Sequence, residues 1–372
     1  MKPNRLSTKK HTLRFAVILS ALVLTGCAST QSTTSSTSAS SASSTVSTVS
    51  TSEESGADET DSTGGAMNGT IGSVIEANLS FKNKDFYIDY STEDIVKIDL
   101  SAPKEADGVK VSGSTVTITE AGTYVLSGTL TDGQIIIDAG DEDDVRLVLE
   151  NASITCTTTA PIYAKNADKV IISLPENTES TVTDTVIGTD GNDALTAAIF
   201  AKCDLSVNGT GTLNVNANAN DGITSEDKLK ITGGVLNITS ADDGLHAEDT
   251  LTIEDGTVTV EESYEGLEAI NLTVNGGTIH VTASDDGLNA AGSSGDGGFG
   301  TAGADALTIN GGTLTVNASG DGLDSNGALT INGGMVYVSG PTGDGDGTFD
   351  CDGVFTINGG VVLGTGSSGM LE

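Results

Sequence analysis

Short runs of alternating apolar and polar residues fill the second half of the chain, and a Gly-Gly pair separates many of them. Residues 229–238 and 329–338 are two copies of this arrangement, each with one run before the glycine pair and one run after it. A period of two is typical of β-strands, whereas an amphipathic helix shows a period of about 3.6. The pattern therefore predicts pairs of short strands joined at a Gly-Gly turn.

A third apolar step follows an acidic residue and a glycine, and this motif recurs along the chain. Its glycines are Gly222, Gly244, Gly266, Gly287 and Gly322, so that successive steps are 22, 22, 21 and 35 residues long. A Gly-rich insertion at 292–303 accounts for the longest step. Repeats of this length stack as a solenoid, in which each coil buries its apolar side chains only against its neighbours. We predict an all-β fold, a right-handed single-stranded parallel β-helix with coils ~4.8 Å apart.

Two further features describe the regions of this solenoid. Asn275, Asn310, Asn332 and Asn358 occupy the same place in successive coils, which predicts a ladder of stacked amides. Residues 71–190 contain short apolar runs between turn residues, but the spacing of these runs is less regular. We therefore predict an N-terminal cap and irregular coils over 71–190, followed by regular coils of about 22 residues over 191–372.

The N-terminus has the form of an export signal followed by a tether. Basic residues precede a short apolar stretch at 15–24, which is too short to span a bilayer, so residues 1–26 are predicted to be a signal peptide. The stretch ends in Leu-Thr-Gly-Cys, which resembles the lipobox of bacterial lipoproteins; the resemblance implies a lipid on Cys27 and an extracellular protein anchored to the cell membrane. An ordinary secreted protein with a chance cysteine is the alternative. Residues 27–70, rich in Ser and Thr, are predicted to be a disordered linker.

The charge balance narrows the choice of partners. The chain has 52 Asp and Glu against 16 Lys and Arg, a formal net charge of −36. Such a protein repels phosphate groups, so we predict no nucleic-acid partner and no membrane contact besides the lipid anchor. The excess of carboxylates instead favours divalent cations as partners. We expect the protein to be a monomer.

Alignment of the coils on the motif glycines stacks acidic residues in two columns. The first column, directly before each glycine, contains Asp221, Asp243, Glu265, Asp286 and Asp321, with Asp346 expected as a sixth member. The second column, two residues after each glycine, contains Thr224, His246, Glu268, Asn289 and Asp324, with Asp350 as its continuation. Because carboxylates ~4.8 Å apart repel one another, such columns are costly unless cations lie between their members.

Calcium fits these columns best among the common metal ions. Ca²⁺ takes about six to eight oxygen ligands from carboxylates, amides and backbone carbonyls, and adjacent coils offer this mixture. The predicted metal ligands are Asp221, Asp242, Asp243, Glu265, Glu268, Asp285, Asp286, Asp321 and Asp324. The alternative is that Asp-Gly is ordinary turn chemistry, with side chains that cap turns and face water.

The stretch from about Tyr124 to Gly369 resembles a family of calcium-binding, carbohydrate-binding parallel β-helix lipoproteins related in shape to pectate lyases. The resemblance rests on Asn-Gly-Thr-Gly-Thr-Leu at 208–213, Asp-Gly-Ile at 221–223 and Ala-Asp-Asp-Gly-Leu at 241–245. It implies a cell-surface protein that binds Ca²⁺ and polysaccharide, either polygalacturonate or cellulose, without catalysis. It also implies that the regular coils form the carbohydrate-binding domain.

Two other functions stay open. The first is a polysaccharide lyase or glycoside hydrolase acting on polygalacturonate. Residues 231–372 contain 21 acidic residues and no Lys or Arg, although a lyase needs a strong base, usually Arg or Lys. Asp242, Asp243 and Asp286 could supply the paired acids of a hydrolase. The second is a structural adhesin or surface spacer, which would bind neither metal nor glycan.

Four side chains outside the columns are predicted to contact the polysaccharide. Lys165 and Lys202 sit at the same offset in two early coils and offer positive charge to a carboxylate of the sugar. Tyr264 and Tyr337 offer flat faces on which a pyranose ring can stack. The alternative interpretations are an ion-pair ladder for the lysines and ordinary packing for the tyrosines.

Overall fold

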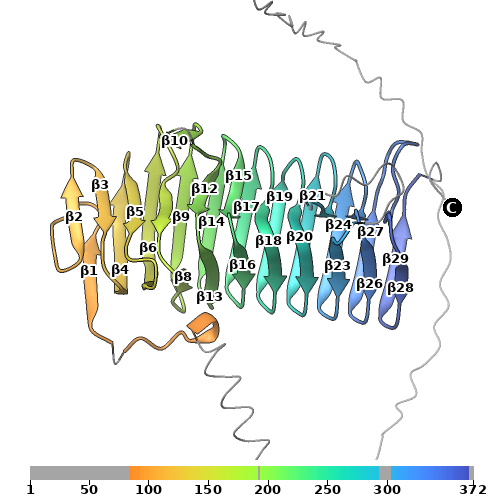
Figure 1. The fold of residues 1–372 in the computed structure, drawn as a ribbon, viewed down its shortest axis with the longest axis horizontal. Coiled ribbons are helices and arrows are strands. Elements are labelled where there is room, and N and C mark those ends of the chain that lie inside the picture. Colours follow the sequence, from red (N-terminus) through yellow and green to blue (C-terminus); the bar gives the residue numbers. More distant parts are fainter. Residues whose placement is uncertain (1–83, 92, 192, 293–302, 368–372) are drawn as a thin grey trace, which may run out of the picture. The chain divides into compact units, whose positions relative to one another are not determined.

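The computed structural model describes residues 84–91, 93–191, 193–292 and 303–367. The predicted signal peptide, Cys27 and the predicted linker over 27–70 lie outside these residues, as does most of the Gly-rich insertion. The described part is a parallel β-solenoid of about 11 turns, which confirms the predicted fold class, and its helix is limited to one turn at residues 84–86 (Figure 1). No helix in the described ranges is both long enough and apolar enough to cross a membrane.

Each coil contributes strands to three parallel lanes. The first lane contains β3 (Thr115–Ile118), β5 (Gln134–Asp138), β7 (Ile162–Asn166), β12 (Ala197–Ala201), β15 (Asp221–Ser225), β22 (Leu288–Ala290) and β25 (Leu323–Ser325). The second lane contains β1 (Ile95–Asp99), β8 (Lys169–Leu174), β13 (Asp204–Gly209), β16 (Lys228–Ile231), β23 (Ala306–Ile309), β26 (Ala328–Ile331) and β28 (Phe355–Ile357). The third lane contains β9 (Glu179–Asp184), β14 (Thr212–Ala217), β17 (Val235–Ser240), β19 (Thr257–Glu262), β21 (Thr278–Ala283), β24 (Thr313–Ala318), β27 (Met335–Ser339) and β29 (Val361–Thr365).

Four long strands continue from one lane into the next. They are β4 (Gly122–Leu130) and β6 (Asp144–Cys156), which join the second and third lanes, and β18 (Leu245–Ile253) and β20 (Leu267–Val274), which join the first and second. Two antiparallel pairs depart from this plan: β2 (Val109–Ser112) pairs with β3, and β10 (Gly188–Asp190) pairs with β11 (Asp193–Leu195). The hairpin of β2 and β3 lies at the N-terminal end of the described solenoid (Figure 1).

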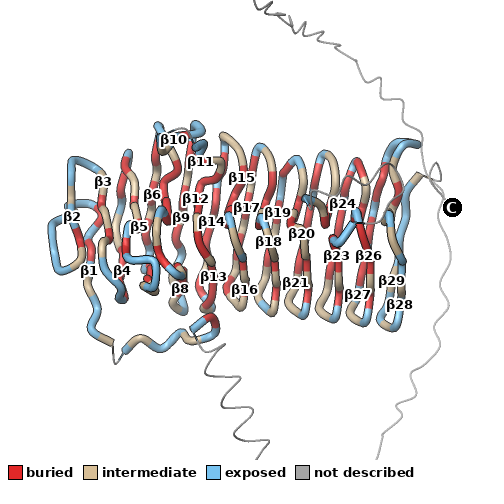
Figure 2. The backbone as a smooth tube through the Cα atoms, in the orientation of Figure 1, coloured by how far each residue is buried: buried red, intermediate tan, exposed pale blue. Residues whose placement is uncertain are grey.

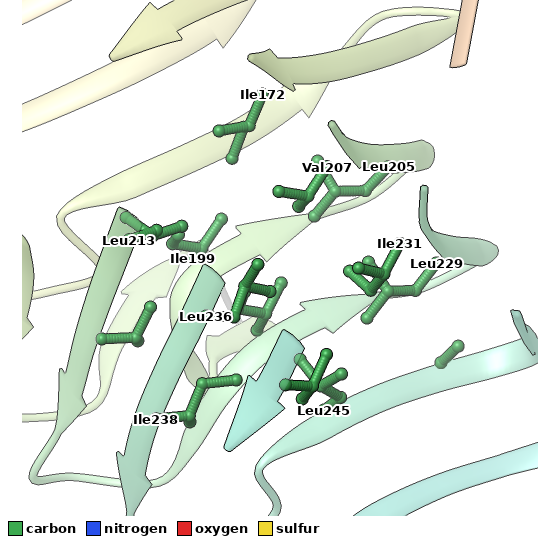
Figure 3. Packing of buried hydrophobic residues seen from close by; sticks show 14 of the residues in the cluster. Ile172, Ile199, Leu205, Val207, Leu213, Leu229, Ile231, Leu236, Ile238 and Leu245 are labelled. Carbon is green, nitrogen blue, oxygen red and sulfur yellow. The ribbon is translucent and has the colours of Figure 1, made fainter. Parts of the chain in front are cut away.

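The core is a set of apolar columns inside the coils. Leu245, Leu267 and Leu288 stack in register in the first lane, and all three side chains are fully buried. Buried positions follow the inner faces of the strands through the solenoid, whereas exposed positions gather at turns and ends (Figure 2). Leucine, isoleucine and valine from all three lanes meet at the centre (Figure 3). Because burial of one such side chain contributes about 1.5–3 kcal/mol, stacking of coils stabilises a chain that has few aromatic residues.

The predicted amide ladder is confirmed at the Gly-Gly turns. Asn310 Nδ2 donates to Asn275 Oδ1 at 2.8 Å, and Asn332 Nδ2 donates to Asn310 Oδ1 at 2.7 Å. Asn358 Nδ2 continues the series by donating to Asn332 Oδ1 at 2.7 Å. Each exposed asparagine thus binds the next, so the register of neighbouring coils is held on the outside as well as in the core.

Candidate functional site

Both predicted columns form on the first lane. In the second column, Thr224, His246, Glu268, Asn289 and Asp324 are consecutive partners of the strand register. The first column lies at or just before the start of each strand, where Asp243 N lies 3.4 Å from Asp221 Oδ1 and Asp321 N donates to Asp286 Oδ1 at 2.6 Å. The sequence alignment of the coils is therefore confirmed for these ten positions.

The columns differ from the prediction at their C-terminal end. The backbone nitrogen of Gly322 bonds to the carbonyl of Gly347, whereas the equivalent nitrogen of Gly287 bonds to the carbonyl of Asp321. Gly347, not Asp346, is therefore the sixth member of the first column, because the loop before it is one residue longer than the alignment assumed. Asp350 does continue the second column, since Leu323, the residue before Asp324, pairs with Phe349.

A histidine separates two carboxylates in the middle of the columns. His246 Nδ1 lies 2.8 Å from Asp243 Oδ2 and 3.1 Å from Glu268 Oε2. Burial lowers the pKa of His246, but its hydrogen bonds with Asp243 and Glu268 outweigh burial and raise the pKa to about 11. Burial also raises the pKa of Glu268, but the hydrogen bonds with His246 and Asp243 outweigh it and hold that pKa below its usual range. A protonated imidazole thus serves as a cation within this part of the columns.

The C-terminal half of the columns contains three carboxylates without such a cation. Side-chain oxygens of Asp286, Asp321 and Asp324 all lie within 4.8 Å of one another. Burial, followed by repulsion from neighbouring carboxylates, raises the pKa of Asp324 to about 7. Burial raises the pKa of Asp286 to about 7 and that of Asp321 to about 6, although backbone N–H groups bond to both side chains. No Lys or Arg follows Lys230 in the sequence, so Lys and Arg from the coils around this triad cannot neutralise it.

Asn289 adds an amide oxygen between the two groups. Its Nδ2 donates to Glu265 Oε2 at 2.9 Å, whereas its Oδ1 is buried and has no hydrogen-bond partner. The residue is 8% exposed and stands in the register between Glu268 and Asp324. A buried hydrogen-bond acceptor without a donor costs about 1–3 kcal/mol. This oxygen is therefore suited to bind a group that accepts an electron pair, such as a cation. Sequence reasoning placed Asn289 in the column but did not select it as a ligand.

The remaining predicted ligands divide into members of the clusters and neighbours of them. Asp221 accepts a hydrogen bond from Thr224 Oγ1 at 2.9 Å and joins Asp243 and His246, and Asp243 also joins Glu265 and Glu268. Asp242 and Asp285, which directly precede column members, belong to none of the three clusters in the described residues. Each of the pairs Asp242–Asp243 and Asp285–Asp286 therefore contributes one side chain to these clusters, rather than two.

The four predicted sugar-contacting residues have different surroundings. Lys165 lies 3.7 Å from Asp190 and 3.9 Å from Asp138, and Lys202 lies 2.7 Å from Asp193, as the ion-pair interpretation expects. Tyr264 lies beside the columns and is exposed; its hydrogen bond with Asp285 raises the pKa of the phenol to about 12. Tyr337 is on β27 in the third lane, whereas Tyr264 is in the turn between β19 and β20.

Comparisons with known proteins agree with this architecture. Residues 112–295 match the model of a family described as carbohydrate-binding domain-containing proteins. A protein of Acetivibrio thermocellus with the same description is 43% identical over 136 residues, which are 36% of this chain and 47% of that protein. The present chain thus spans about half the length of this curated relative.

A solved structure is similar over most of the solenoid. It is described as a polysaccharide lyase-like protein from C. thermocellum, in a gadolinium derivative, and is similar with a TM-score of 0.55 and 27% sequence identity. The similarity covers 72% of this chain and 99% of the other. Residues 112–295 are thus similar to carbohydrate-binding domain-containing proteins, and the solenoid shares its fold with a polysaccharide lyase-like protein.

Proposed function

We propose that this protein is a non-catalytic polysaccharide-binding module that holds Ca²⁺ in the acidic columns of the first lane. The observation that carries the proposal is the half-buried triad of Asp286, Asp321 and Asp324, together with the unpartnered Oδ1 of Asn289, which pairs with Asp324 in the strand register. Three carboxylates and an amide are hard oxygen donors of the kind that Ca²⁺ prefers. Burial and then repulsion between carboxylates raise the pKa of all three acids, and a divalent cation would relieve this repulsion.

Calcium is favoured over zinc and over a purely structural turn. The triad has no thiol or imidazole, which zinc sites in proteins ordinarily use. Turn-capping aspartates that face water would titrate near their usual pKa, whereas burial moves these well above it. The similar solved structure is a gadolinium derivative, and Gd³⁺ is also a hard cation that takes oxygen ligands.

We propose further that bound Ca²⁺ connects the protein to an acidic polysaccharide of the polygalacturonate type. A protein with a net charge of −36 repels a uronate polymer unless a cation bridges the two sets of carboxylates. The two lysines predicted to contact the sugar, Lys165 and Lys202, are already paired with carboxylates of the protein itself. Anchoring by a lipid on Cys27 would place the module on the outside of the cell.

Retention on an immobilised acidic glycan tests the proposal. The full chain is applied to polygalacturonate beads in CaCl₂ or in EDTA, and bound protein is measured together with released unsaturated and reducing ends. We expect retention in calcium, loss in EDTA and no product. The triple variant D286N/D321N/D324N should not be retained, whereas D352N, which removes an exposed carboxylate from the same region, should bind as the wild type does.

Other results would assign another function. Release of unsaturated ends would indicate a lyase, and release of reducing ends alone a hydrolase. Absence of retention in both buffers, together with a melting temperature that calcium leaves unchanged, would favour a surface spacer.

A further inference from the structure

A segment before the first strand is fastened along the second lane. Residues 84–91, here called the strap, run back from β1 towards β8 and β13 (orange in Figure 1). Asp85 is 4% exposed: Lys169 Nζ and Ser206 Oγ bond to its Oδ1, and Lys230 Nζ lies 3.4 Å from its Oδ2. The strap is therefore held by a buried carboxylate that links three strands of the second lane.

The backbone of the strap is fastened as well. Asn208 Nδ2 donates to the carbonyl of Asp85 at 2.8 Å, and Thr232 Oγ1 donates to the same oxygen at 2.7 Å. Arg146 Nη1 donates to the carbonyl of Tyr87 at 2.7 Å, and its guanidinium lies 5.5 Å from the centre of the Tyr87 ring. These bonds use the face of the strap that points towards the solenoid.

The opposite face of the strap exposes large apolar side chains. Phe86 is 42% exposed and Ile88 is 49% exposed, although both stand on a segment whose position is fixed. Ile88 lines two adjoining hollows of about 950 Å³ and about 500 Å³, and Thr210 lines both as well. Phe86 lines the smaller one. Exposed apolar groups held rigidly at the rim of a hollow are typical of a binding groove.

Glycines, which have no side chain beyond the backbone, form much of the floor of this groove. A Cβ on Gly233 would lie 2.7 Å from the carbonyl oxygen of Gly209, and one on Gly277 would lie 2.7 Å from that of Gly256. Neighbouring turns are thus too close for side chains, which explains the glycines by packing and leaves peptide groups beside the groove. Thr232, Thr257 and Thr278 line it from successive coils, which are ~4.8 Å apart, about the length of one sugar unit in an extended chain.

The charges around the groove select against an acidic ligand. Its charged lining residues are Asp89, Glu176 and Asp255, all acidic, and no Lys or Arg lines either hollow. The nearby Lys169 and Lys230 already bind Asp85. A uronate chain would therefore be repelled here, while an uncharged chain could place its hydroxyls on threonine and peptide groups and its apolar ring faces on Phe86 and Ile88.

We propose that the groove between the strap and the Gly-Gly turns binds one extended strand of an uncharged polysaccharide. The proposal rests on the proposed function only in that the protein binds polysaccharide, and this second site works without calcium. The turns that form its floor, from Gly209 to Thr278, lie within the region that matches the carbohydrate-binding family. The strap lies outside that region and supplies the apolar wall.

Native affinity gels in EDTA test the second site. Xylan, galactomannan and hydroxyethyl cellulose are cast separately into the gels, and the migration of the full chain is compared with that of F86A/I88A. The matched control is V186A/I187A, which removes two equally exposed apolar side chains elsewhere. We expect the wild type and the control to be retarded by at least one of the three polymers, and F86A/I88A to bind that polymer at least tenfold more weakly. Melting temperatures should agree, because all four side chains are exposed.

The results separate this proposal from the calcium function. Retention of F86A/I88A on polygalacturonate in CaCl₂ should equal that of the wild type, which would show that only the groove is damaged. Equal retardation of wild type and F86A/I88A would overturn the groove as the site. Absence of retardation of the wild type, or retardation that needs calcium, would overturn it as well, while the polygalacturonate assay would still decide the proposed function.

Discussion

Two stretches of the same acidic columns manage their charge in different ways. Around coil β18, His246 stands between Asp243 and Glu268, and its raised pKa keeps it protonated. Two coils further on, Asn289 takes the equivalent position, and the cluster of carboxylates beyond it contains no cationic side chain. Burial raises the pKa of carboxylates in both stretches, including Asp243 and Glu265 in the first, but only the first stretch contains a cationic side chain among them. A column with one repeating backbone can thus combine a segment that contains a cationic side chain with a segment that offers only carboxylates and an amide.

A second contrast separates early from late coils. Several lysines of the described early coils are paired with carboxylates, as Lys169 with Asp85 and Lys202 with Asp193 show. The late coils have no Lys or Arg at all. Apart from protonated His246, positive charge on the coils after Lys230 must therefore come from protons or ions in the solvent.

The largest effect is expected from removing the internal cation. In H246Q, Asp243 and Glu268 lose their counter-charge, and breaking such a buried pair costs about 3 kcal/mol. The variant should be less stable than the wild type in EDTA, and calcium should restore more stability to it than to the wild type. Urea unfolding in both buffers measures this, with H280Q, which changes an exposed histidine, as the control. Equal stability of H246Q and H280Q in EDTA would show that the imidazole has no such role.

Removing the triad should give the next largest effect. Calcium at about 100 times its dissociation constant stabilises a protein by about 2.7 kcal/mol, and D286N/D321N/D324N should lose this gain. In EDTA the same variant should be at least as stable as the wild type, because the repulsion is gone. Melting curves with and without CaCl₂ measure both quantities, with D352N as control. A triple variant that calcium still stabilises would place the metal elsewhere.

The pH dependence follows from the raised pKa values. Folding raises the pKa of Asp286 and Asp324 to about 7, whereas an aspartate in the unfolded chain has a pKa of about 3.9. Between these values the folded state binds more protons than the unfolded state, so stability in EDTA should fall as the pH rises from about 4 to about 7. Unfolding at a series of pH values measures the slope, which should flatten in the triple variant. Stability that rises with pH in this window would contradict the assignment.

The smallest effect is expected in the amide ladder, whose uncharged asparagines stack without any cation. N332A removes the hydrogen bonds with Asn310 and Asn358, and we expect a loss of about 1 kcal/mol, since these groups are exposed. Calcium should neither cause nor repair this loss. N317A, which changes an exposed asparagine of the third lane, is the control in the same unfolding experiment. If the effect of N332A depended on calcium, the amide ladder would not be independent of the acidic columns.

The sequence predicted the columns because a solenoid turns a repeat in one dimension into neighbours in space. Asp221 and Asp243 are 22 residues apart, and their stacking follows from the repeat alone. The alignment failed at Asp346, where a loop of irregular length breaks the repeat. It also could not distinguish Asp286, a member of the triad, from Asp285, because that depends on which side of the turn each side chain occupies.

The strap shows what no repeat can predict. Asp85 bonds to Ser206, 121 residues away, through a segment with no repeat partner. By itself the sequence determined the parallel β-solenoid, its lanes and its two acidic columns, since these follow from local alternation and a constant step. Only the tertiary structure decided which carboxylates share a cation, that Asn289 Oδ1 is buried without a partner, and that a groove lies beside Phe86. These properties depend on burial and on contacts between distant segments, and a local sequence pattern predicts neither of these.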